Sequence, residues 1–233
     1  MRKVLAVVPS LVVAGLLGCS ASDGDQAGAP SSSTRSGAVS APPFKPSSSA
    51  AAPVPTGPPP ADAPVAAVTA WVQAGSPVDA AGFRSATRDD ITTDLGADVA
   101  FVTPAGKTQC RTGATLAPGA MACLAELADP PAQPAEVYGQ WVGNWVDFDG
   151  GSAQVGSVHG DPGAFTEGKG RELAYGSSLR FGDYQCRTDP AGLFCVNFAR
   201  QTALQMSDAG VVAFGCLQEV APPADAGVRY ECL

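Results

Sequence analysis

The chain has 233 residues, of which 45% are hydrophobic, 15% charged and 7% aromatic, with 27 glycines and 21 prolines. This composition excludes a collagen, a coiled coil and a wholly disordered chain. Lysine and arginine number 14 against 22 aspartates and glutamates, so the net charge is −8. Such an acidic surface is repelled by phosphate backbones and anionic headgroups. We therefore expect no nucleic-acid partner and no electrostatic docking on lipid.

The first 18 residues have the organisation of a secretory signal. Arg2 and Lys3 precede the apolar run Val4–Leu17, and Gly18 is the small residue at the expected cleavage site. The run is shorter than the roughly 20 residues that a membrane-spanning helix needs. We expect residues 1–18 to be a signal peptide that directs export.

The signal ends in Leu16-Leu17-Gly18-Cys19, which resembles a bacterial lipobox. In that motif the cysteine thiol receives a diacylglyceryl group and the cysteine becomes the mature N-terminus. Leu17 departs from the motif, which more often has a small or β-branched residue there. The resemblance implies a lipid anchor at Cys19 that holds the protein on the extracytoplasmic face of the plasma membrane. The alternative is an ordinary cleaved signal followed by a chance cysteine.

Residues 19–62 combine this cysteine with a segment of very biased composition. The 43 residues from Ser20 to Asp62 include 10 serines, 9 prolines and 9 alanines. Such a segment cannot bury enough apolar surface to offset the entropy lost on ordering it. We expect a disordered tether that lets a single folded domain, residues 63–233, stand away from the membrane.

Six cysteines remain after Cys19, an even number that favours disulfides in an oxidising compartment. The sequence alone cannot choose among their possible connectivities. We favour the set that joins the cysteines nearest in sequence. A zinc site is disfavoured because no Cys-x-x-Cys pair occurs, and we expect neither a metal nor another cofactor. The six are Cys110, Cys123, Cys186, Cys195, Cys216 and Cys232.

Residues 62–73 predict a helix, with Asp62 placed as its N-cap and Gly75 placed to end it. A second helical turn is expected at Ser76, with Pro77 in its first position. The apolar residues at helical spacing are Val65, Val68, Trp71 and Val72.

Beyond Asp98 the pattern changes to short apolar or β-branched runs separated by turn residues, which indicates strands. We therefore expect a mainly β (α+β) domain of antiparallel hairpins stapled by disulfides, with one or two short N-terminal helices. The predicted strands are Val99–Thr103, Met121–Leu127, Trp141–Phe148, Ala153–Val158, Ser178–Phe181, Tyr184–Arg187, Leu193–Phe198, Thr202–Met206 and Val211–Phe214.

A short internal echo supports the stapled hairpins. The segment Gln109-Cys110-Arg111-Thr112 recurs as Gln185-Cys186-Arg187-Thr188, and each copy is followed by a turn and a second cysteine. Two β-hairpins, each with a disulfide across its strands, would explain the echo. The alternative is a coincidence of four residues.

One histidine, His159, lies in Ser157-Val158-His159-Gly160-Asp161. Three neighbours on one strand cannot converge as a Ser-His-Asp triad, although a distant serine and aspartate could still complete one. The surrounding Gly-Asp-Pro-Gly sequence is typical of a turn. We therefore expect a turn histidine and assign no catalytic residue.

The segment Asp147-Phe148-Asp149-Gly150-Gly151 is similar to the start of a calcium loop. An EF-hand would need a further oxygen ligand where Gly151 stands and a glutamate where Val158 stands. We expect a hairpin turn at the Asp-Gly pair instead.

Aromatic residues concentrate between Tyr138 and Phe148, a stretch that includes Trp141 and Trp145. These two tryptophans could form a platform that binds a sugar or an apolar ligand. They could equally supply the core of a small β domain, which we favour because they are its largest apolar side chains.

Two runs, Gly143–Gly150 and Phe181–Pro190, together with the lipobox make the chain similar to the cell-envelope lipoproteins of mycobacteria and related actinobacteria. The similarity covers residues 63–233, the signal and the tether. It implies an envelope lipoprotein acylated at Cys19, and it transfers no catalytic position.

The leading expectation is a membrane-anchored, disulfide-stapled domain that binds or supports an unidentified component of the cell envelope without catalysis. One alternative is a carrier of an apolar envelope ligand, held between a sheet and the N-terminal helix in a cavity lined by Trp141 and Trp145. Another is an envelope hydrolase that uses His159.

Overall fold

The structure, a computed structural model, describes residues 56–113, 115–159 and 163–233. The expected signal peptide, Cys19 and most of the tether lie outside these residues. Residues 56–62 were assigned to the tether but are described, and Pro59 among them is buried. The part of the chain that the structure describes contains no helix long and apolar enough to cross a membrane.

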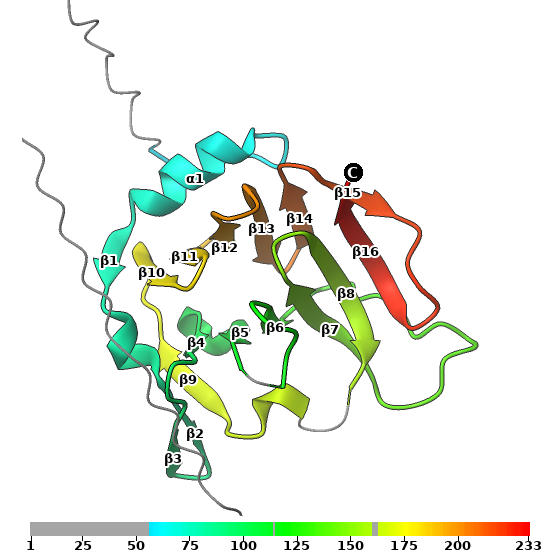
Figure 1. The fold of residues 1–233 in the computed structure, drawn as a ribbon, viewed down its shortest axis with the longest axis horizontal. Helices are drawn as coiled ribbons and strands as arrows, with labels where there is room; N and C mark the ends of the chain where they lie inside the picture. Colours follow the sequence, from blue (N-terminus) through cyan, green and yellow to red (C-terminus); the bar gives the residue numbers. More distant parts are fainter. Residues whose placement is uncertain (1–55, 114, 160–162) are drawn as a thin grey trace, which may run out of the picture. The chain divides into compact units, whose positions relative to one another are not determined.

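The described residues form one α-helix, three 3-10 helices and sixteen strands (Figure 1). The helices are α1 (Val65–Gln73), η1 (Ala80–Phe83), η2 (Pro104–Gly106) and η3 (Gly163–Phe165). The first eight strands are β1 (Ser76–Val78), β2 (Ser85–Arg88), β3 (Ile91–Asp94), β4 (Ala100–Val102), β5 (Thr108–Arg111), β6 (Met121–Ala125), β7 (Trp141–Phe148) and β8 (Ser152–Val158). The others are β9 (Lys169–Glu172), β10 (Ser177–Phe181), β11 (Tyr184–Asp189), β12 (Gly192–Asn197), β13 (Thr202–Ser207), β14 (Gly210–Phe214), β15 (Leu217–Val220) and β16 (Ala226–Cys232).

The strands form two sheets. One has six strands in the order β1-β10-β11-β12-β13-β14, and the other has ten in the order β15-β16-β8-β7-β6-β5-β4-β9-β2-β3. Neighbouring strands are antiparallel except for two parallel pairs, β1 with β10 and β4 with β9. The mainly antiparallel β fold expected from the sequence is confirmed.

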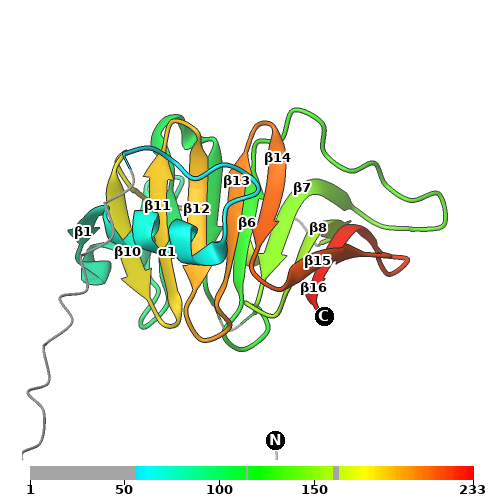
Figure 2. The ribbon, with the colours of Figure 1, turned by 90° about the horizontal axis from the view of Figure 1, so that it is seen from above.

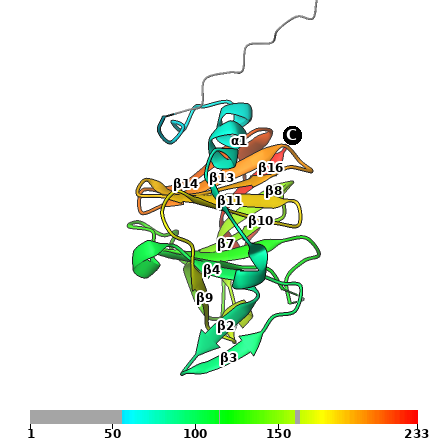
Figure 3. The same ribbon diagram turned by 90° about the vertical axis from the view of Figure 1, so that its left-hand side faces the viewer.

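The sheets are stacked with their main core between them, and α1 adds a third layer on the six-stranded sheet (Figure 3). Strand alternation produces this core, because successive side chains point to opposite faces of a sheet. In β11, for example, Tyr184, Cys186 and Thr188 are buried, and the residues between them are only partly buried. The inward faces contribute Phe101, Met121, Phe148, Leu179, Leu193 and Leu204.

The six cysteines of the domain form three disulfides, and each joins cysteines nearest in sequence. Cys110 bonds to Cys123 and Cys186 to Cys195, in each case across a hairpin with Cα atoms 4.1 Å apart. Directly opposite, non-hydrogen-bonded positions of antiparallel strands are separated by about 4.5 Å, which suits a disulfide. The third bond joins Cys216, just before β15, to Cys232 in β16. The stapled hairpins are confirmed.

Both sheets contain the same five-stranded meander. Strands β10 to β14 pair in chain order in one sheet, and β4 to β8 do so in the other. The second and third strands of each meander carry the hairpin disulfide. A parallel strand flanks the first strand in both cases: β1 lies beside β10, and β9 beside β4. The four-residue echo in the sequence therefore marks a repeated unit of the fold.

A short segment covers the outer face of each sheet. Helix α1 lies across β11, β12 and β13 (Figure 2), and the ring of Trp71 lies 4.7 Å from that of Phe194. On the ten-stranded sheet, Ala164 and Phe165 of η3 pack in a cluster with Trp145.

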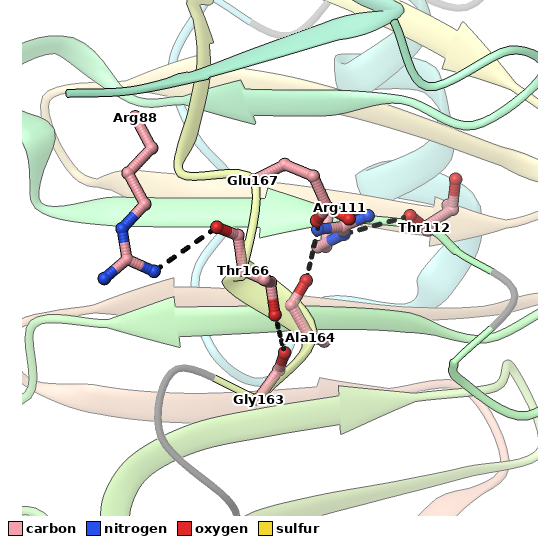
Figure 4. Close-up of polar contacts among 7 residues, drawn as sticks. All are labelled: Arg88, Arg111, Thr112, Gly163, Ala164, Thr166 and Glu167. Carbon is pink, nitrogen blue, oxygen red and sulfur yellow. Dashed lines mark hydrogen bonds and ion pairs between the residues drawn. The ribbon is translucent and has the colours of Figure 1, made fainter. Parts of the chain in front are cut away.

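In each copy of the repeat, the arginine that follows the first disulfide cysteine contacts the segment that covers the sheet. Arg187 donates from Nη1 to the carbonyl of Trp71 in α1 at 2.6 Å. Arg111, in the equivalent position of β5, donates to the carbonyl of Ala164 and pairs with Glu167 (Figure 4). The repeat thus extends from the core disulfide to the contacts outside the sheet.

Helix α1 begins later than predicted. The sequence suggested residues 62–73 with Asp62 as the N-cap, but the helix starts at Val65 and its N-cap is Pro64. The proline holds an extended conformation with φ −63° and ψ 144°, and its carbonyl accepts the amide of Ala67 at 2.8 Å. Proline therefore sets the start of the helix.

The helical turn predicted at Ser76 is wrong. Ser76 begins β1, which pairs in parallel with β10. Pro77 lacks a backbone donor but is tolerated because β1 is an edge strand. A 3-10 turn follows, and Asp79 caps it by accepting the amide of Ala81 at 2.9 Å.

Candidate functional site

A polar hollow of about 300 Å³ lies beside the β7–β8 hairpin. Strand register builds it, because Asp147 of β7 pairs with Gln154 of β8, and Gln154 pairs with Arg229 of β16. The loop between β5 and β6 closes the other side. The hollow is lined by Thr115, Leu116, Ala117, Ala120, Asp147, Phe148, Asp149, Ser152, His159 and Arg229.

Asp147 is held in place by a neighbour on its own strand. The indole Nε1 of Trp145 donates to Asp147 Oδ1 at 2.8 Å. Burial raises the pKa of Asp147 above its usual value, while the Trp145 hydrogen bond and the charges of His159 and Arg229 oppose that rise. A partly desolvated carboxyl group beside a hollow is typical of binding and catalytic sites.

His159 lies against the same tryptophan. Its ring stacks on Trp145 with centroids 3.5 Å apart, and its Nε2 lies 2.6 Å from the hydroxyl oxygen of Ser157. Burial lowers the pKa of His159 below its usual value, and the nearby charge of Asp147 works in the opposite direction. The histidine predicted as a turn residue is therefore part of a polar cluster.

The three side chains do not have the geometry of a hydrolase triad. Asp147 Oδ2 lies 3.9 Å from Nε2 of His159, the same ring nitrogen that contacts Ser157. A triad needs the serine on one imidazole nitrogen and the carboxylate on the other. Ser157 is also only 5% exposed, so its hydroxyl has little access to a substrate.

Arg229 supplies positive charge on the β16 side. Its Nε donates to Glu231 Oε1 at 3.0 Å, and the residue also lines the hollow.

Asp149 shapes the β7–β8 hairpin, because its carboxylate accepts the amides of Gly151 and Ser152 at 2.8 and 2.6 Å. The turn expected at Asp149-Gly150 is confirmed.

The structure places the two candidate tryptophans in different surroundings. Trp145 is 2% exposed and packs edge-on against Phe165 with centroids 5.3 Å apart. Trp141 is half-buried, and its indole donates to the carbonyl of Pro131 at 2.8 Å. Both lie on the ten-stranded sheet, whereas α1 packs on the six-stranded sheet. The structure therefore does not bring them to the helix interface suggested for a carrier.

Within residues 56–113, 115–159 and 163–233, no three His, Cys, Asp or Glu side chains gather so as to hold a metal ion.

The sequence pointed to some members of this site but not to their arrangement. Asp147 and His159 were noted for other chemistry, and Arg229 was missed. Their proximity depends on the pairing of β7, β8 and β16, which includes a bulge between Val142 and Val146. Nothing in the local sequence signals that bulge except Gly143 and Gly156, and Gly156 adopts a positive φ of 75°.

No protein-family model, curated protein or solved structure matches this chain. Function is therefore inferred from the residues of the chain itself.

Proposed function

We propose that this chain is an exported, lipid-anchored protein of the cell envelope, similar in kind to actinobacterial envelope lipoproteins, whose folded domain binds a ligand without catalysis. The anchor is the diacylglyceryl group on Cys19, and the domain stands on the extracytoplasmic face of the plasma membrane.

Two features support export. The N-terminal charges, apolar run and Gly18-Cys19 ending match a lipoprotein signal. Three disulfides join all six cysteines of the domain, and such bonds persist in oxidising compartments outside the cytoplasm.

The hollow beside Asp147 is the observation that carries the binding role. Convergent polar groups from separate strands, one of them a partly buried carboxyl, are what small-molecule sites commonly present. Ser157 and Asp147 both lie nearest the same nitrogen of His159, Nε2, and this arrangement favours binding over serine-hydrolase chemistry. A component of the envelope is the expected ligand.

Changing Cys19→Ser removes the only position that the lipobox can acylate. Two or three acyl chains give stable anchoring, at about 0.8 kcal/mol per buried methylene, so we expect most of the variant to leave the membrane fraction. The measurement is fractionation of full-length protein in a host that processes lipoproteins, with Ser20→Ala as the matched control. Membrane retention of Cys19→Ser equal to that of the control would contradict the anchor.

A further inference from the structure

The hollow beside Asp147 carries charge of both signs on opposite sides. We propose that it binds a small zwitterion, a molecule with both an ammonium group and a carboxylate, as a free amino acid has. The ammonium group faces Asp147 and the carboxylate faces Arg229. This inference rests on the binding role proposed above and names the chemistry of the ligand.

Asp147 provides the ammonium end of the site. Its Oδ1 is occupied by the Trp145 indole, while Oδ2 faces His159 Nε2 at 3.9 Å, beyond hydrogen-bond distance. Oδ2 can therefore accept a hydrogen bond from a ligand, and about a third of the side chain remains exposed to receive it. Charge-assisted hydrogen bonds of this kind are roughly twice as strong as neutral ones.

His159 adds little positive charge beside Asp147 near neutral pH. Desolvation disfavours its protonated form, so the ring stands beside the carboxylate largely without charge. A ligand ammonium group would supply the missing positive charge at the same place.

Arg229 provides the carboxylate end. Its Nε is engaged by Glu231, which leaves the terminal Nη groups of the planar fork to a second carboxylate. Asp147, Gln154 and Arg229 occupy one row across three adjacent strands. With strands about 4.8 Å apart, the Cα atoms of Asp147 and Arg229 are separated by roughly 10 Å, so the two groups address opposite ends of one small molecule.

Apolar residues of the loop between β5 and β6 can contact the hydrocarbon part of such a ligand. Leu116, Ala117 and Ala120 line the hollow. A metal ion is less well served, because a zinc site requires at least three protein ligands and, among the residues that the structure describes, only Asp147 and His159 approach one another here.

The test uses full-length Cys19→Ser protein labelled with ¹⁵N. The readout is the Trp145 indole N–H signal, assigned by Trp145→Phe, because this group donates directly to Asp147. The probes are glycine, γ-aminobutyrate and 6-aminohexanoate, which span a range of charge separations. Methylammonium and acetate each supply one end alone, and zinc chloride tests the metal.

We expect at least one zwitterion to shift the Trp145 signal saturably. Its affinity should fall about tenfold or more in Asp147→Asn and in Arg229→Gln, as loss of a charged hydrogen bond predicts. Methylammonium and acetate should bind at least about tenfold more weakly. Asp208→Asn, at the β13–β14 turn beside Lys107, should bind like the parent protein. Unchanged Trp71 and Trp141 indole signals show that each variant is folded.

The proposal is overturned if no zwitterion shifts the Trp145 signal, if only zinc does, or if acetate alone binds as tightly as the zwitterions. Each of these results leaves the membrane anchor untouched, since the Cys19→Ser fractionation measures that separately. A ligand of different charge that shifts the same signal would refute the zwitterion while retaining the binding role.

Discussion

Protonation of His159, which lines the hollow, makes the stability of the folded domain depend on pH. Partial burial lowers the pKa of the imidazole below the ordinary value of 6.5, although the charge of Asp147 acts in the opposite direction. The unfolded chain therefore binds this proton more readily than the folded protein does. By linkage, the stability contribution of neutral His159 is complete above about pH 6.5 and is lost as the pH falls toward the lowered pKa of the folded state.

We predict that the parent protein loses more stability between pH 7 and pH 5 than His159→Gln does. Urea unfolding at each pH measures the difference. Asp147 has the opposite sign, because its raised pKa means that ionisation costs stability as the pH rises above the ordinary value of 3.8. Both proteins retain Asp147, so its own desolvation contributes to the two curves alike. Parallel curves for the two proteins would show that His159 titrates as it does in the unfolded chain.

Among the secondary-structure elements, α1 and η3 are held on their sheets by Arg187 and Arg111, respectively. The Arg187 guanidinium lies 4.0 Å above the Trp71 ring while it donates to the Trp71 carbonyl. A hydrogen bond from a charged group contributes about 1.5–3 kcal/mol, and the contact with the ring adds about 0.5–1 kcal/mol.

We therefore predict that Arg187→Gln lowers the free energy of unfolding by about 2–4 kcal/mol and speeds amide exchange in α1. Arg180→Gln is the matched control, because Arg180 lies 4.4 Å above the ring of Phe198 but is exposed; its loss should cost less than about 1 kcal/mol. Chemical unfolding and hydrogen exchange measure both effects. Equal losses in the two variants would mean that Arg187 does not fasten the helix.

Most strands with a buried face could be predicted from the sequence, although the largely buried β5 was not among the predicted strands. The run Trp141–Phe148 was predicted with its observed bounds, since bulky apolar residues end at an Asp-Gly turn. Strand β3 was missed because all four of its residues, Ile91–Asp94, are exposed and leave no alternating pattern. The candidate site was predictable only as separate residues, because Asp147 and Arg229 approach each other through long-range strand pairing.

For the whole molecule, the repeated meander explains how an acidic chain with few large apolar residues maintains a folded domain. Each half contributes one sheet, one core disulfide and one arginine that fastens a covering segment. Closing a loop of 13 residues with a disulfide stabilises a domain by about 3 kcal/mol in the chain-entropy model. A domain stabilised in this way suits an oxidising location outside the cytoplasm.

We propose a domain that is exported, disulfide-bonded and anchored through Cys19. The most direct test is the intact mass of the full-length gene product recovered from membranes of a host that processes lipoproteins. We predict a chain that begins at Cys19, carries the mass of a diacylglyceryl group or its further acylated form, and lacks the six hydrogens of three disulfides. A chain that retains Met1, begins elsewhere without lipid, or keeps its thiols would contradict export, anchoring or disulfide formation, respectively.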